Sequence, residues 1–112
     1  MITIWHNPKC SKSRQTLALV QEHGEVTVRT YLDHAPNVEE IRNLCALLQI
    51  SPVQLMRTNE ARFKELGLAK DDADETLITA MAQAPILIER PVVFANGKAA
   101  LGRPPEAVLD IL

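Results

Sequence analysis

The sequence predicts an α/β protein with a mixed four-stranded sheet and a helical segment inserted between the two halves of that sheet. Three observations support this class. The N-terminal third has the order strand, helix, strand; apolar residues of the middle third recur at helical spacing; and the C-terminal third has two short strands and a helix. With 112 residues the chain is long enough for one domain and too short for two, so we expect a single domain over residues 1–112.

The first three elements predict two parallel strands. Ile2–Trp5 is short, apolar and rich in β-branched residues, as expected of a buried strand. A turn over residues 6–10 leads to a helix over residues 11–23, which Gly24 ends. Residues 26–31 alternate in polarity as a second strand does. A helix between two such strands joins them in parallel with a right-handed crossover.

Start and stop signals divide the middle third into four helices. They are a helix over residues 38–48 with Asn37 and Glu40 as a capping box, a short helix that begins at Ser51-Pro52-Val53-Gln54, a helix over residues 60–66 that ends at Gly67, and a helix opened by Asp72 with Glu75 that stops near Pro85. Cys45 lies on the apolar face of the first of these helices, where a free cysteine commonly packs as a small hydrophobe, so we expect it in the core.

The C-terminal third predicts a hairpin and a last helix. Val92–Ala95 and Lys98–Leu101 are short strands joined by Asn96-Gly97, a strong two-residue hairpin signal. Pro104-Pro105-Glu106 starts the helix, and its apolar side carries Val108, Leu109, Ile111 and Leu112. The complete order is β-α-β, then helices, then β-β-α, which is the thioredoxin-like pattern.

Composition excludes several classes of function. A net charge of −2 argues against nucleic acid and anionic membranes as partners, and no stretch approaches the roughly 20 apolar residues of a membrane span. The N-terminus has neither a basic lead nor an apolar segment with a cleavage site, so we expect no signal peptide and a cytoplasmic location. Two cysteines form no disulfide framework, and with three scattered histidines they offer no paired zinc ligands.

Cys10 is the residue best placed to carry chemistry. It stands between the first strand and the first helix, where free backbone N–H groups present partial positive charge. An exposed helix terminus contributes only about 0.3–1 kcal/mol, so nearby cations must help to ionise the thiol. Arg14, one helical turn away, is the first candidate. The alternative is that Cys10 is merely a small residue at a turn.

Three arginines and one histidine complete the candidate site. Arg57, Arg90 and Arg103 each lie beside apolar or turn residues. Either they only cover apolar surface or cap helices, or they converge near Cys10, where their planar guanidinium groups suit a tetrahedral oxyanion. His6 is either a surface residue or a group that orients substrate or stabilises the thiolate.

Residues 6–14 (HNPKCSKSR) resemble the H-x3-C-x3-R signature of the glutaredoxin-linked arsenate reductases. Three further segments are similar to the arginine-bearing segments of that family: Leu55-Met56-Arg57, Ile88-Glu89-Arg90-Pro91 and Gly102-Arg103-Pro104. The resemblance covers essentially the whole chain. It implies the thioredoxin-like fold and a cis bond before Pro91. It also implies that Cys10 is the nucleophile, that His6 and Arg14 lie near it, and that Arg57, Arg90 and Arg103 bind the oxyanion.

The same resemblance implies the reaction, which is reduction of arsenate to arsenite through a thio-arsenate ester on Cys10. Glutathione is the implied co-substrate and glutaredoxin the implied electron donor, with no tightly bound cofactor. An external donor agrees with the sequence, because Ser13 stands where a C-x-x-C motif has its second cysteine.

Other classes of protein remain as alternatives or are set aside. A phosphatase-like arsenate reductase needs a C-x5-R loop, and the spacing from Cys10 to Arg14 is too short for one. A general glutathione-dependent thiol reductase shares Cys10 but has no need for three arginines. A redox-sensing regulator that works by a disulfide needs the C-x-x-C motif that this chain lacks.

Overall fold

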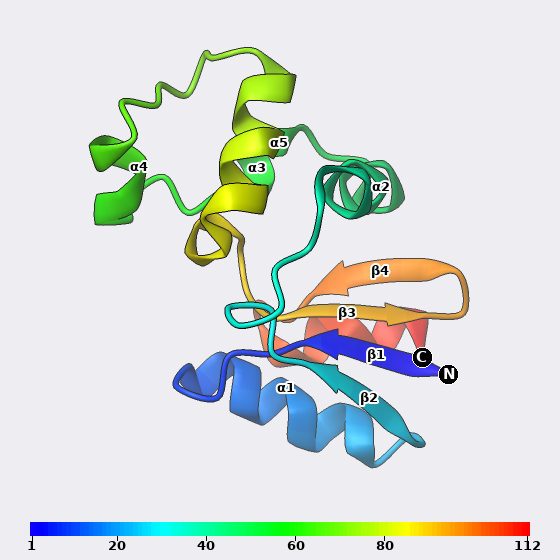
Figure 1. The fold of residues 1–112 in the computed structure, drawn as a ribbon. Helices are drawn as coiled ribbons and strands as arrows, with labels where there is room; N and C mark the ends of the chain where they lie inside the picture. Colours follow the sequence, from blue (N-terminus) through cyan, green and yellow to red (C-terminus); the bar gives the residue numbers. More distant parts are fainter. The chain divides into compact units, whose positions relative to one another are not determined.

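The computed structural model describes residues 1–112, and the chain forms two compact units (Figure 1). The sheet unit comprises residues 1–34 and 90–112, and the helical unit comprises residues 35–89. The helical unit is therefore the segment inserted between the two halves of the sheet, as the sequence predicts. None of the helices is both long and apolar enough to cross a membrane.

The sheet unit is built on four strands in the order β2-β1-β3-β4. They are β1 (Ile2–Trp5), β2 (Val26–Arg29), β3 (Val92–Ala95) and β4 (Lys98–Leu101). β1 pairs with β2 in parallel, whereas the β1–β3 and β3–β4 pairs are antiparallel. This confirms the predicted thioredoxin-like mixed sheet.

The strand register brings several chain segments to one edge of the sheet. Trp5, the last residue of β1, pairs with Arg29 on one side and with Val92 on the other. Val92 pairs in turn with Leu101, the last residue of β4. Residues that follow Trp5 or Leu101, or that precede Val92, therefore leave the sheet at the same edge.

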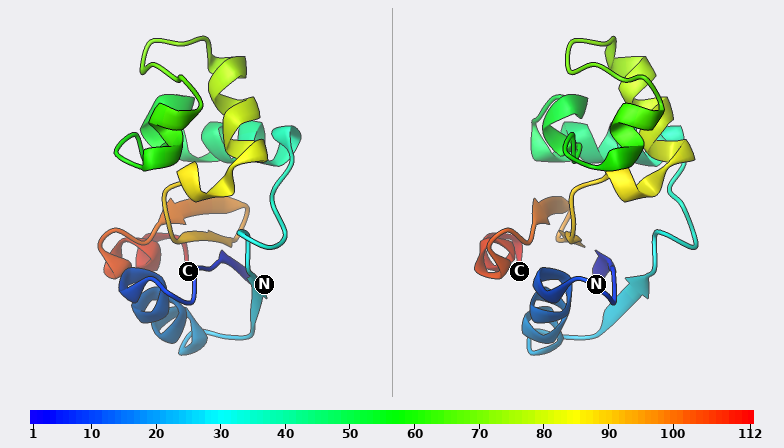
Figure 2. Two further views of the ribbon diagram at one scale, coloured as in Figure 1. Left: turned by 60° about the vertical axis from the view of Figure 1, so that its left-hand side comes forward. Right: turned by 90° about the vertical axis from the view of Figure 1, so that its left-hand side faces the viewer.

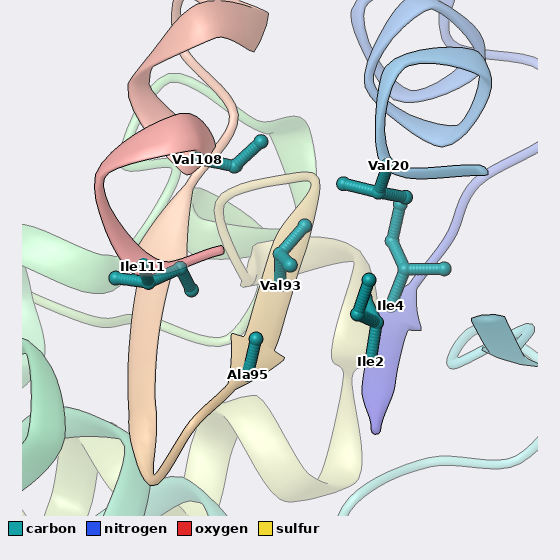
Figure 3. Packing of buried hydrophobic residues seen from close by; sticks show 7 residues of the cluster. All are labelled: Ile2, Ile4, Val20, Val93, Ala95, Val108 and Ile111. Atoms are coloured by element: carbon teal, nitrogen blue, oxygen red, sulfur yellow. The ribbon is translucent and has the colours of Figure 1, made fainter. Parts of the chain in front are cut away.

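One face of the sheet is covered by α1 (Ser11–Gln21) and the 3₁₀ helix η2 (Pro105–Ile111), which lie side by side (Figure 2). Alternate residues of β1 and β3 point at these helices because successive side chains of a strand face opposite sides of the sheet. Figure 3 shows the resulting cluster of buried side chains, which comprises Ile2, Ile4, Val20, Val93, Ala95, Val108 and Ile111.

The last helix differs from the prediction in its type. A 3₁₀ helix has three residues per turn, so Val108 and Ile111 share the buried face while Leu109 is turned away. Leu109 is 40% exposed, and the prediction that it lies on the apolar side was wrong.

The helical unit contains α2 (Val38–Leu48), α3 (Pro52–Leu55), α4 (Ala61–Glu65), α5 (Asp74–Gln83) and the short 3₁₀ helix η1 (Pro85–Leu87). α2 packs against α5, and Cys45 is buried on α2 as predicted. The predicted capping box is also confirmed: the backbone N–H of Glu40 donates to Asn37 Oδ1 at 2.8 Å, and that of Asn37 donates to Glu40 Oε1 at 3.0 Å.

Some boundaries differ from prediction because local hydrogen bonds end or delay an element. The first helix ends at Gln21 and not at residue 23, since the N–H groups of Glu22 and His23 donate to carbonyls three residues back. The second strand stops at Arg29, since the carbonyl of Thr30 accepts the N–H groups of a turn that follows. Asp72 does not open α5. Its Oδ2 accepts from the N–H of Ala69 at 2.9 Å, and Ala73 takes the N-cap position instead.

Candidate functional site

The edge of the sheet defined by Trp5, Val92 and Leu101 carries five of the six predicted site residues. His6 directly follows β1, and its N–H donates to the carbonyl of Arg29 at 2.8 Å. Arg90 lies two positions before β3, and Arg103 lies two positions after β4. Cys10 and Arg14 come from the loop after His6 and from the first turn of α1. Strand pairing thus brings together residues that are up to 97 positions apart, from His6 to Arg103.

Cys10 is the N-cap residue of α1, with an extended backbone, and its side chain is partly buried. Its N–H donates to the carbonyl of Asn7 at 3.0 Å, which closes the loop onto the helix. The buried Asn7 side chain makes a second bond in this loop, accepting the N–H of Lys9 at 3.0 Å. Two hydrogen bonds to Asn7 therefore fix the loop just before Cys10.

The surroundings of the thiol favour its ionised form. Burial raises the pKa of the Cys10 thiol. Hydrogen bonds from the backbone N–H of Ser13, from the Arg90 side chain and from the backbone N–H of Lys12 lower it, and so does the positive charge of Arg90. The lowering effects win, and the pKa lies below the ordinary value of cysteine.

Arg90, rather than Arg14, is the cation paired with the thiol. The guanidinium of Arg14 donates from Nη1 to the carbonyl of Pro8 at 2.8 Å, and this hydrogen bond stabilises the loop before Cys10. Arg90 also has a buried Nε that lacks a hydrogen-bond partner. Buried donors are normally paired, so this N–H is available to an acceptor beside Cys10.

His6 is buried and fixed by the first turn of α1. Its Nδ1 lies 2.6 Å from Ser13 Oγ, and Ser13 itself is fully buried. Burial, together with the nearby charge of Arg14, lowers the pKa of His6, so that its imidazole is neutral near pH 7. The alternative of a surface histidine is wrong for His6.

Arg103 is positioned by close packing of the residue before it. The N–H of Gly102 donates to the carbonyl of Pro91 at 2.9 Å. A Cβ at Gly102 would lie 2.5 Å from Thr16 Oγ1 and 2.7 Å from Pro91 Cγ, so only glycine fits between α1 and the start of β3. Arg103 follows with an exposed side chain.

Both Arg-Pro bonds of this edge are cis. The bond between Arg90 and Pro91 is the one that the family resemblance implies, and it is confirmed. The bond between Arg103 and Pro104 is cis as well, although neither the sequence pattern nor the family resemblance predicts it.

Arg57 belongs to the helical unit, so its convergence on Cys10 stays a prediction. Within that unit its N–H donates to the carbonyl of Leu87 at 2.7 Å, and its Nη2 lies 3.2 Å from Glu60 Oε1. Its Nε and Nη1 are buried without hydrogen-bond partners. Like Arg90, Arg57 therefore has guanidinium N–H groups that are available to an acceptor.

Sequence reasoning missed three residues that organise the site, namely Asn7, Ser13 and Gly102. A signal was available for Ser13, because it shares the buried face of α1 with Thr16 and Val20 at helical spacing. Asn7 acts through local hydrogen bonds with Lys9, Cys10 and Ser13, and an asparagine that bonds the backbone two residues on is a common turn signal. Gly102 acts through contacts with Thr16 and Pro91, which are distant in sequence, and no periodicity indicates those.

Comparisons with known proteins agree with this geometry. The model of the ArsC family matches residues 5–111. The chain is 47% identical over 114 residues to the uncharacterized protein YfgD of Escherichia coli strain K12, covering 99% of this chain and 96% of that protein. It is 43% identical over 114 residues to an arsenate reductase of Neisseria meningitidis serogroup A, covering 99% and 97%. The solved structure of an arsenate reductase from Vibrio cholerae has 49% sequence identity and a TM-score of 0.93, covering 99% of this chain and 97% of that one.

The pairing of Cys10 with Arg90 predicts how fast the thiol reacts at different pH values. Alkylation by iodoacetamide, followed for each cysteine by peptide mass spectrometry, should give Cys10 a midpoint below that of a free cysteine. Arg90→Gln removes the charge and the side-chain hydrogen bond, so the midpoint should move to higher pH. Arg62→Gln, an exposed arginine of α4, is the matched control and should leave it unchanged. An unchanged midpoint in Arg90→Gln would contradict the pairing.

Proposed function

The chain belongs to the ArsC family, and on that premise we propose that it reduces arsenate to arsenite through a covalent intermediate on Cys10. One observation carries the proposal: the Cys10 thiol, whose pKa is lowered, is paired with a guanidinium that keeps a buried, unpartnered Nε–H. A nucleophile and an anion-binding donor at one point are what attack on an oxyanion requires.

Local charge supports an anionic substrate. The first 21 residues contain Lys9, Lys12 and Arg14 but none of the chain's 14 acidic residues. All three cations are exposed around Cys10, whereas the protein as a whole has a net charge of −2. Such a local excess of positive charge attracts anions, both arsenate and the carboxylates of glutathione.

The first chemical step is attack of the Cys10 thiolate on arsenic(V). A sulfur–arsenic bond forms and an arsenic–oxygen bond breaks, and the departing oxygen leaves as water after gaining protons from the substrate or solvent. The product is a thio-arsenate ester, with arsenic still in the +5 state. In this proposal Arg90 stabilises the charge that develops on the remaining oxygens, and its contact with Cys10 and its unpartnered Nε support that role.

Electrons for the reduction come from external thiols in this proposal. Glutathione displaces a second oxygen from arsenic as water, and glutaredoxin then attacks the glutathione sulfur. That attack forms a mixed disulfide and leaves two electrons on arsenic, which is released as arsenite on hydrolysis. The chain itself supports an external donor: Ser13 occupies the C-x-x-C position, and Cys45 is buried with a pKa that burial and the charge of Asp74 raise.

Arg57 and Arg103 complete the proposed oxyanion site. Both are expected to contribute guanidinium donors, and the unpaired Nε and Nη1 of Arg57 support that role. Three planar, permanently charged groups match the geometry and charge of a tetrahedral oxyanion better than flexible ammonium groups do.

The central test is arsenate-dependent oxidation of NADPH in the presence of glutathione, glutaredoxin and glutathione reductase. The wild-type chain should show a rate that requires arsenate and glutaredoxin, and Cys10→Ser should abolish it because the nucleophile is lost. Cys45→Ser is the matched control. It replaces a buried thiol outside the proposed chemistry and should keep the activity.

Three results would redirect the proposal. Loss of activity in a folded Cys45→Ser variant would mean that the chain supplies its own resolving thiol. An undiminished rate without glutaredoxin would exclude glutaredoxin as donor. A rate with disulfide substrates but none with arsenate would favour a general thiol reductase instead.

Arginine substitutions test the oxyanion site. Arg57→Lys and Arg103→Lys keep the charge but lose the planar fork, and each should lower kcat/KM for arsenate by about 10²-fold, in the range seen when one oxyanion donor is removed. Arg62→Lys provides the control on the exposed side of α4. Wild-type kcat/KM in both site variants would remove those arginines from the site.

A further inference from the structure

We propose that Ser13 is a positioning residue that holds His6 with its proton on Nε2, so that Nε2 is a hydrogen-bond donor and not a base. The role of the His6 Nε2–H group in catalysis rests on the proposed function. The position of the proton on His6 is independent of that function and can be measured without any substrate.

The hydrogen bonds of Ser13 determine where its hydroxyl hydrogen points. Ser13 is fully buried, and its Oγ lies 3.0 Å from the backbone nitrogen of Asn7 and 2.6 Å from His6 Nδ1. A backbone N–H can only donate, so the Asn7 contact uses a lone pair of the hydroxyl. The hydroxyl hydrogen is then available only for His6.

The buried hydroxyl must donate, and His6 Nδ1 is its acceptor. Buried donors are nearly always paired, and Nδ1 can accept only when it carries no proton. A neutral imidazole without a proton on Nδ1 carries it on Nε2. The reverse arrangement, with Nδ1–H donating to Ser13, would bury the hydroxyl hydrogen without a partner.

Surrounding charge acts in the same direction. An imidazolium carries protons on both nitrogens, so a hydrogen bond from the Ser13 hydroxyl to Nδ1 disfavours the charged form of His6. Burial and the positive charge of Arg14 disfavour it further. The loop and first turn of α1 around His6 contain no carboxylate that would favour it, and Lys9 and Lys12 add positive charge there.

The loop that holds Cys10 also holds this arrangement. Asn7 donates its N–H to Ser13 Oγ, and its carbonyl accepts the N–H of Cys10 at 3.0 Å. The position of the nucleophile and the tautomer of His6 therefore depend on one peptide segment. A neutral Nε2–H is a donor to negative oxygen or sulfur, but a very poor acid, so the proton for the departing oxygen of arsenate comes from elsewhere.

The proposal is tested by NMR of protein labelled with ¹⁵N at histidine, across neutral pH and without arsenate. His6 should show a protonated Nε2 and an unprotonated Nδ1. His23, whose Nδ1 donates to the carbonyl of Leu19 at 3.1 Å, should give the opposite pattern in the same spectrum. In Ser13→Ala the Nδ1 of His6 should become partly protonated, and its titration should move to higher pH.

Controls separate positioning from a general structural effect. Ser11→Ala makes the same change on the exposed side of the same turn and should leave the His6 resonances unchanged. Ser13→Thr restores a hydroxyl and should restore the Nε2–H form. His6→Gln carries an N–H near the place of Nε2, whereas His6→Asn carries one near Nδ1, so Gln should retain on the order of tenfold more kcat/KM for arsenate.

A protonated Nδ1 in the wild-type protein would overturn the proposal, and so would an unchanged His6 spectrum in Ser13→Ala. Equal kcat/KM in His6→Gln and His6→Asn would remove the donor role. A wild-type chain with the Nε2–H form but no arsenate reduction would support the arrangement of hydrogens and contradict only the proposed function.

Discussion

The site depends on one constraint, the pairing of β1 with a strand on each side. Trp5 stands between Arg29 and Val92, and Val92 pairs with Leu101. Because β1 is a central strand, its end is held from both sides, and the segments that enter or leave β3 and β4 share its edge. This register fixes the positions of Arg90, of Arg103 and of the loop that leads from β1 to Cys10. A slip of one residue would turn every side chain of a strand to the other face and disperse them.

At that edge, chemistry is set by a balance between burial and donors. Partial burial alone keeps a thiol protonated, whereas the N–H groups of the first turn of α1 and the Arg90 guanidinium favour the thiolate. Behind the thiol, the Ser13 hydroxyl joins His6 Nδ1 to the backbone N–H of Asn7. The buried guanidinium N–H groups of Arg57 and Arg90 lack partners, and they are the kind of donor that an incoming oxyanion needs.

Local signals predicted most of the fold and the place of the nucleophile. The apolar run of β1, the capping box at Asn37, the hairpin at Asn96-Gly97 and the junction at Cys10 are all encoded within a few neighbouring residues. The cation that pairs with the thiol escaped prediction because its position depends on contacts between residues distant in sequence. Arg90, 80 positions from Cys10, pairs with the thiol because β3 lies beside β1. Arg14, only four positions away, turns to the carbonyl of Pro8 instead.

The proposed mechanism requires a covalent bond between Cys10 and arsenic, and mass spectrometry can detect it. The protein is incubated with arsenate and glutathione but without glutaredoxin, so that the intermediate is not consumed, and is then analysed intact and as peptides. The proposed mechanism predicts one arsenic per chain, on the peptide that contains Cys10, and none in Cys10→Ser. No bound arsenic in the wild-type protein, or arsenic on Cys45 instead, would contradict it.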